Sequence, residues 1–206
     1  MEERNDLNPV ERDALREVAN IGAGHAATAL SQMTGRTIMI NVPEVNIRRL
    51  EEVAEMLGPP ETVVVAIAMH MMGDLTGQTM VILPEPAART LCDLLLRRPL
   101  GTTAGFEAME ESSLKETGNI LTSAYLTALS DFLGMMLVPS VPSLMTDYAG
   151  AVLTSVSLNF GQGRDVVFCV DTAFRVEGAP GLLHGEFVLL PDTVSLGAIF
   201  EAIRLA

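Results

Sequence analysis

Apolar and polar residues follow helical spacing at the start of the chain, where Leu15, Val18 and Ile21 fall on one arc. The preceding Asn8-Pro9-Val10-Glu11 is a helix start. Asn can cap the first turn, Pro fits where no N–H is needed, and Glu11 stands at the capping-box position. Gly35 supplies a C-terminal stop. The pattern therefore predicts a long helix that runs to about Met33.

The same pattern returns later in the chain. The stretch 13–20, DALREVAN, recurs as SSLKETGN at 112–119, an offset of 99 residues. Between 15–43 and 114–142 there are 11 identities over 29 aligned positions. A repeat at a fixed offset indicates one structural unit built twice. A second long helix is therefore expected over about Phe106–Leu133, with its stop at Gly134.

The remaining pattern divides each half into matching segments. Each long helix is followed by an extended segment that ends at proline, a short helix, two strands and a closing helix. These segments are, in the first half, Thr37–Pro43, Glu51–Leu57, Thr62–Met71, Gly77–Leu83 and Pro86–Arg98, and in the second, Met135–Pro142, Thr146–Val156, Asp165–Phe174, Glu186–Leu190 and Thr193–Leu205.

This order predicts an α+β fold. It is a pseudo-two-fold duplicated α-β-α-β-β-α unit, with about six strands in one sheet and the two long helices packed on it. One domain, residues 1–206, would consist of repeats at about 8–98 and 106–205, joined through 98–105.

Composition and charge narrow the class of protein. Hydrophobic residues make up 49% of the chain, enough for a substantial core, and the net charge is −13. An acidic surface repels phosphate backbones, so nucleic acid and anionic membranes are not expected partners. It would suit a partner with a basic face, but an acidic surface is also an ordinary aid to solubility and equally an adaptation to a salty cytoplasm.

The N-terminus, the length of the apolar runs and the cysteine usage together predict a cytoplasmic protein. The N-terminus lacks the apolar segment of a leader peptide. The longest apolar run, Thr62–Met72, is interrupted by His70 and is shorter than the ~20 residues that span a bilayer. Cys92 and Cys169 lie in apolar runs without metal-site spacing, as is typical of a reducing compartment.

The candidate chemistry lies on the two long helices. Asp13, Glu17 and Asn20 are spaced by four and three residues, so they form one row, and the row recurs in the second helix. An apolar arc beside the first row is expected to face the core and leave the row pointing outward; it comprises Val10, Ala14, Leu15, Val18 and Ile21. A solvated helix face could also give such a row, and inheritance alone could keep both Glu–Asn pairs.

A carboxylate and a carboxamide one turn apart suit a particular reaction. Asn has no titratable group near neutrality, but its amide can hold a water molecule in a chosen line. Glu can bind a cation such as a lysine ammonium on a partner. In phosphoryl transfer the attacking water needs orientation more than deprotonation, so hydrolysis of an acyl phosphate fits this pair.

The full pattern is [Asp/Ser]-x3-Glu-x2-Asn-x22-Pro, and it resembles the signature of the CheC/CheX/FliY family of chemotaxis phosphatases. It is carried once by Asp13, Glu17, Asn20 and Pro43, and again by Ser112, Glu116, Asn119 and Pro142. With two motifs and no additional flagellar-switch domain, the chain resembles the CheC type over essentially its whole length.

The resemblance implies a substrate and roles. The substrate would be phosphorylated CheY, with Glu17 or Glu116 pairing with the receiver's lysine and Asn20 or Asn119 aligning water at the aspartyl phosphate. Asp13 and Ser112 would contact the partner. The chain would bind no metal or cofactor of its own, since Mg²⁺ would arrive with CheY. CheD is a further expected partner, and the rival function is a non-catalytic adaptor that binds CheD or the flagellar switch.

Other residues are weaker candidates. Gly22 and Gly24 interrupt the first helix, which indicates close backbone approach or a local bend. The small side chains there would serve either tight helix packing or a lowered surface for a partner. The paired Ser31 and Ser130 are expected to pack between the halves. Three scattered histidines lack zinc-site spacing, at His25, His70 and His184.

Overall fold

The computed structural model describes residues 8–41, 45–49, 52–53, 58–160, 166–179 and 181–205. The two long helices are α1, Pro9–Thr34, and α4, Ala108–Leu133, each of 26 residues. Each begins with a capping box, formed by Asn8 with Glu11 and by Glu107 with Glu110. Each ends at a glycine in the left-handed conformation, Gly35 with φ 67° and Gly134 with φ 65°. The predicted starts and stops of these helices are confirmed to within two residues.

The strands form one antiparallel sheet. In the order β1-β7-β8-β4-β3-β5, each strand pairs with its neighbour, while β2 also pairs with β7 and β6 with β3. The central β4–β8 pair joins strands of the two halves, from Gly77 opposite Pro191 to Ile82 opposite Glu186. The strand bounds are β1 Ile38–Asn41, β2 Val45–Arg49, β3 Val63–Gly73, β4 Gly77–Pro84, β5 Leu137–Pro139, β6 Ser143–Tyr148, β7 Val166–Val176 and β8 Leu182–Pro191.

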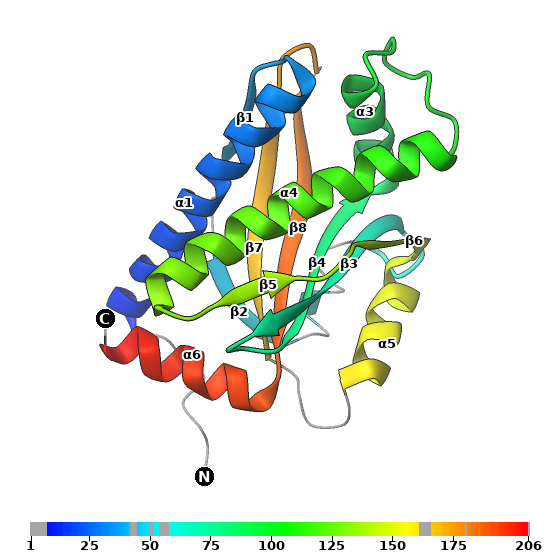
Figure 1. Ribbon diagram of the computed structural model, residues 1–206. Coiled ribbons are helices and arrows are strands. Elements are labelled where there is room, and N and C mark those ends of the chain that lie inside the picture. The colour runs from blue at the N-terminus through cyan, green and yellow to red at the C-terminus, as the bar shows by residue number, and fades with distance from the viewer. Residues whose placement is uncertain are drawn as a thin grey trace.

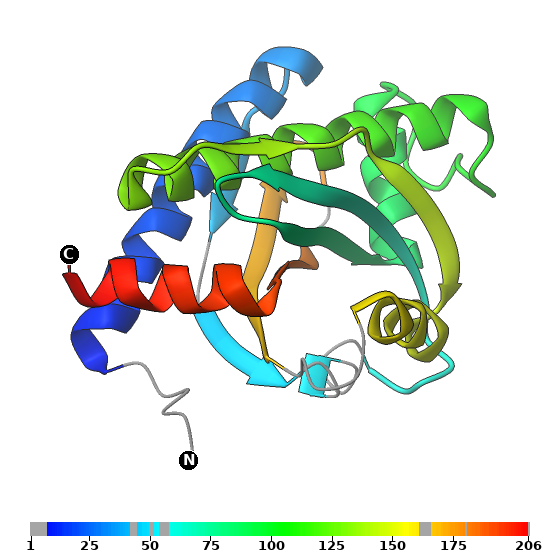
Figure 2. The ribbon, with the colours of Figure 1, turned by 60° about the horizontal axis from the view of Figure 1, so that its bottom comes forward.

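Helices cover both faces of this sheet. α1, α3 (Glu85–Leu95), α4 and α6 (Thr193–Leu205) pack on one face, and α5 (Ala149–Phe160) packs on the other. In Figure 1 α4 crosses in front of β7 and β8 while α1 runs to their left, and Figure 2 shows α4 and α5 on opposite sides of the strands. Successive residues of β3 serve the two layers alternately, with Ile67 in the larger core and Ala66 in the smaller. Among the described residues, no helix is long and apolar enough to cross a membrane.

The prediction of about six strands is wrong, because the sheet has eight described strands. The two additional strands are β2 and β6, and the expected helix over Thr146–Val156 begins only at Ala149. β6 is mostly exposed and runs along the edge of β3, so its sequence lacks the apolar alternation that marks a half-buried strand. The expected helix Glu51–Leu57 lies outside the described residues apart from 52–53, which are helical.

The junction after each long helix is built in the same way. The Asp74 N–H donates to the Met136 carbonyl at 2.9 Å, and the Met136 N–H donates to the Asp74 carboxylate at 2.7 Å. Glu177 and Thr37 exchange the corresponding two bonds at 2.9 and 3.1 Å. Thr37 and Met136 are themselves 99 positions apart. These bonds fix where the chain leaves α1 and α4 to enter the sheet.

The paired serines belong to these junctions and not to packing between the halves. Ser31 accepts a hydrogen bond from the Ile38 N–H at 2.9 Å, and the Ser130 hydroxyl donates to the Met135 carbonyl. Each serine therefore ties the last turn of a long helix to the segment that follows. The expectation that they pack between the halves is wrong.

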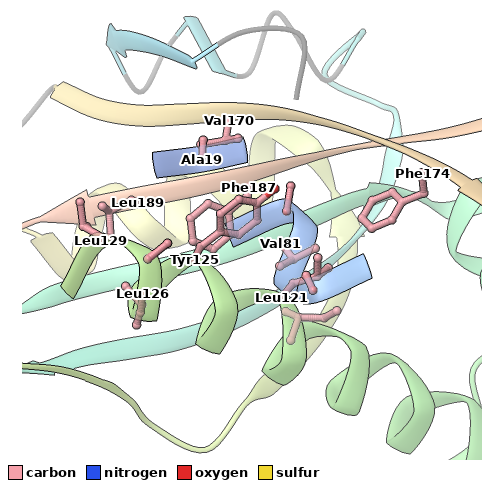
Figure 3. Close-up of a cluster of buried hydrophobic side chains, with 14 of the residues drawn as sticks. Ala19, Val81, Leu121, Tyr125, Leu126, Leu129, Val170, Phe174, Phe187 and Leu189 are labelled. Carbon is pink, nitrogen blue, oxygen red and sulfur yellow. The ribbon is translucent and has the colours of Figure 1, made fainter. Parts of the chain in front are cut away.

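The crossing of α1 and α4 explains Gly22. A Cβ at Gly22 would lie 2.7 Å from Tyr125 Cδ1 and 3.0 Å from Tyr125 Cα, so only glycine allows this approach. The Tyr125 ring stacks on Phe187 of β8, with 4.5 Å between ring centroids (Figure 3). Gly22 therefore serves tight helix packing. Gly24 is exposed, and a Cβ added there would meet no atom within 4 Å.

Candidate functional site

The first polar row stands in solvent on α1. Asp13, Glu17 and Asn20 are all exposed, as the helical spacing predicted. The expectation that the apolar arc beside this row faces the core is only partly confirmed. Leu15 and Val18 are buried, whereas Val10 and Ile21 are exposed, so their assignment to the core is wrong.

The second polar row lines an open depression of about 400 Å³ on α4. Ser112 and Glu116 are exposed, and Asn119 is half-buried. The lining residues are Ala108, Glu111, Ser112, Lys115, Glu116, Asn119 and Pro142. All four members of the second motif therefore meet in one place.

Pro142 reaches the depression because the chain turns back along its helix. α4 ends at Gly134, β5 pairs with β3, and Pro142 follows β5 before β6 begins. The 22-residue spacing between Asn119 and Pro142 is thus the length of chain that returns to the asparagine. The corresponding Pro43 lies outside the described residues.

Sequence reasoning missed two residues of this depression. The Lys115 ammonium pairs with the Glu111 carboxylate at 3.1 Å, with both side chains partly exposed. Their spacing of four residues on a helix was a signal for this ion pair. The pair places one positive and one negative charge beside Glu116 and Asn119.

The groups in the two rows limit the available chemistry. They offer carboxylates, carboxamides and a hydroxyl, with the Lys115 ammonium beside the second row, and all but the half-buried Asn119 are exposed or partly exposed. Within the described parts of the chain, no three or more His, Cys, Asp or Glu side chains are grouped to hold a metal ion. His25, His70 and His184 are exposed. An open row of this kind can position groups on a partner that covers it.

The two thiols are unsuited to nucleophilic work. Both cysteines are buried, Cys92 on α3 where it contacts Ser113 of α4, and Cys169 on the α5 side of the sheet. Burial raises the pKa of Cys92 to about 11 and that of Cys169 to about 12. A thiol with such a pKa holds almost no thiolate near neutrality.

A separate group of charges lies on the α5 face of the sheet. Glu186 of β8 stands opposite Asp171 of β7 in register, and both are half-buried. Burial, with the Asp171 charge in addition, raises the pKa of Glu186 to about 7, against a smaller lowering by Arg48. The cluster is distant in the fold from both polar rows, since it lies across the sheet from α1 and α4.

Glu186→Gln is expected to stabilise the protein at pH 8. The folded-state pKa of Glu186 is above its ordinary value of 4.5, so the protonated form is favoured by folding. The free energy of unfolding therefore falls as pH rises from about 4.5 to about 7, and Gln removes that loss. Because the group is partly solvated, we expect a gain of about 1 kcal/mol at pH 8 and none near pH 4. Urea unfolding at both pH values measures it, with the exposed Glu201→Gln as control; parallel changes in the two variants would contradict the assignment.

Comparisons with known proteins agree with this arrangement. The profile of the CheC-like family matches residues 10–47 and 109–146, which contain both rows. The CheY-P phosphatase CheC of Bacillus subtilis is 34% identical over 201 residues, which span 97% of this chain and 96% of that protein. The flagellar motor switch phosphatase FliY of B. subtilis is 25% identical over 215 residues, covering 97% of this chain and 56% of that protein. The crystal structure of Thermotoga maritima FliY matches with a TM-score of 0.78 and 22% identity, over 96% of this chain and 98% of that one, a likeness of fold.

Proposed function

The chain belongs to the CheC-like family, and from this membership we propose that it is a phosphatase that hydrolyses the aspartyl phosphate of a CheY-type response regulator. One observation carries the proposal beyond family likeness. Glu116, Asn119 and Pro142 line a single open depression on α4, so a carboxylate and a carboxamide are presented together to a partner. A substrate carried on another protein suits an open depression, because the partner's own surface completes the site.

In the proposed mechanism the two polar side chains have different tasks. Glu116, or Glu17 on α1, pairs with the lysine of the receiver and holds the partner in register. Asn119, or Asn20, reaches the receiver's phosphorylated pocket and hydrogen-bonds the water that attacks phosphorus in line with the bond to the aspartate oxygen. That P–O bond breaks, which releases inorganic phosphate and restores the carboxylate. Asp13 and Ser112, one turn before each glutamate, contact the partner beside this pair.

The magnesium ion that such a reaction uses is assigned to the receiver. No role in the mechanism requires this chain to ligate it, since the proposed tasks of Glu and Asn are docking and orientation of water. When bound, the ion would neutralise charge on the phosphoryl oxygens. The residues of this chain then need only bring the amide into line.

We further propose that the two halves are copies of one unit and that each provides a site. Support comes from the 99-residue offset, which relates the capping boxes, the glycine stops and the junction hydrogen bonds. The arrangement of β1 and β2 beside β7 also parallels that of β5 and β6 beside β3. Two rows related in this way would present equivalent polar groups on separate helices.

The experiment is direct. A CheY-type receiver is phosphorylated with acetyl phosphate, the donor is removed, and loss of phosphate is followed with and without this chain. Acceleration that grows with the concentration of the chain supports the proposal. If decay is unchanged while the chain binds CheD or a flagellar-switch protein, the adaptor function replaces it.

A further inference from the structure

The starting observation is that large apolar side chains flank both polar rows in solvent. Val10 and Ile21 on α1 are 77% and 45% exposed. Met109 on α4 is 61% exposed, and Val141, next to Pro142 of the depression, is 86% exposed. These four residues are called the apolar rim. Because their side chains are exposed, packing of the hydrophobic core does not explain why these positions are apolar.

The rim lies in line with the polar groups. Val10 precedes Glu17 by seven residues and Met109 precedes Glu116 by seven, which is two turns on the same face of each helix. Ile21 follows Asn20 directly at the other end of the first row. At the second row, Val141 adjoins Pro142, which lines the depression. The first row therefore has an apolar side chain at both ends, and the second has Met109 before its start and Val141 beside the depression.

The spacing sets the size of what can cover a row. Val10 and Ile21 are 11 residues apart along α1, so the row extends for about 16 Å. A ligand as small as a phosphate ion cannot touch both ends and reach the glutamate and asparagine between them. A protein surface can, and polar groups at the centre with apolar anchors around them are a recurrent arrangement in protein interfaces.

We propose that the apolar rim is the docking surface for the phosphorylated receiver, with one receiver on each row. This inference rests on the proposed function, because the receiver is the partner that must approach Asn20 and Asn119. The rim supplies binding energy beside each row, and the asparagine acts on the phosphorylated site of the receiver. The receiver surface beside the phosphorylated aspartate must then offer apolar contacts on two sides.

The test separates docking from chemistry. Val10→Ser with Ile21→Ser is made in an Asn119→Ala background, and Met109→Ser with Val141→Ser in an Asn20→Ala background, so that the kinetics of each row are read alone with phosphorylated receiver. Because a row without its asparagine still docks, the dissociation constant for beryllofluoride-loaded receiver is measured on a variant that carries all four serine substitutions. We expect each pair to raise KM about tenfold and to leave kcat within about twofold, and the four substitutions together to raise the dissociation constant about tenfold.

Val194→Ser is the matched control, because Val194 on α6 is 83% exposed and belongs to neither row. It should change none of the three constants. An unchanged dissociation constant in the variant with all four serines would overturn the docking surface, as would a fall in kcat alone in the pairs. If the parent proteins bind beryllofluoride-loaded receiver but accelerate no phosphate loss, the proposed function fails and the dissociation constants still decide the docking surface. If the parents bind no receiver, both proposals fall.

Discussion

Replacing both Asn20 and Asn119 by alanine is expected to reduce the acceleration of receiver dephosphorylation by about 100-fold, or about 2.7 kcal/mol of barrier. Alanine cannot hydrogen-bond the attacking water, so water must find the line of attack unaided. Docking should persist, because both glutamates and the apolar rim remain. The variant should therefore lose kcat and keep a KM close to that of the parent protein.

Each single variant should keep part of the activity, since the other row is intact. Phosphate release at a fixed concentration of phosphorylated receiver measures all three proteins. Asn41→Ala is the control, because Asn41 is an exposed asparagine on β1 outside both rows. Full activity in the double variant would show that the asparagines take no part in the mechanism. Complete loss from one single variant would show that the other row does not work.

The elements with local signals were predictable from the sequence. The ends of α1 and α4 follow from capping residues and glycine stops, which act within one turn of the chain. β3 and β4 follow from long apolar runs whose pairing lies in the middle of the sheet. Local chemistry decides such elements, so one sequence is enough to place them.

The missed strands depend on distant partners. β6 pairs with β3 from Val63 opposite Tyr148 to Ala68 opposite Ser143, about 80 residues away in the chain. Its side chains are mostly exposed, so its strand conformation comes from backbone hydrogen bonds to an edge that the sequence does not reveal. A segment with helical neighbours and no alternation is then easily predicted as helix.

The candidate site was predictable in its polar row but not in its surroundings. A spacing of four and three residues places Asp13, Glu17 and Asn20 together whatever the helix packs against. Which apolar residues are buried depends on which side of the helix packs against the core. At 100° per residue, Val10 and Ile21 lie within about 40° of Glu17, whereas Leu15 lies about 160° from it. In this fold the Leu15 side of α1 packs against the core, and only the tertiary structure reveals that.

Gly118→Ala is expected to destabilise the fold by about 3 kcal/mol and to lower activity at the second row. A Cβ at Gly118 would lie 2.5 Å from Ile67 Cγ2 and 3.0 Å from Ile67 Cβ, closer than side chains pack. α4 would have to move away from β3, and Asn119, the next residue, would move with it. Urea unfolding and the dephosphorylation assay in an Asn20→Ala background measure the two effects.

The matched control is Gly24→Ala, another helical glycine but one with nothing within 4 Å of a Cβ. It should stabilise the protein by about 0.5 to 1 kcal/mol, because alanine is the better helix former. The source of the Gly118 effect can be tested with Ile67→Ala, which removes the nearest methyl group. In that background Gly118→Ala should be much less harmful, so the double-mutant cycle should give a favourable coupling. If the cycle is additive, or if Gly118→Ala is neutral, α4 does not rest on Ile67 through this glycine. The packing of Gly118 on Ile67 would then not determine how closely Asn119 lies to the sheet. Another contact would have to hold the Asn119 amide at the depression.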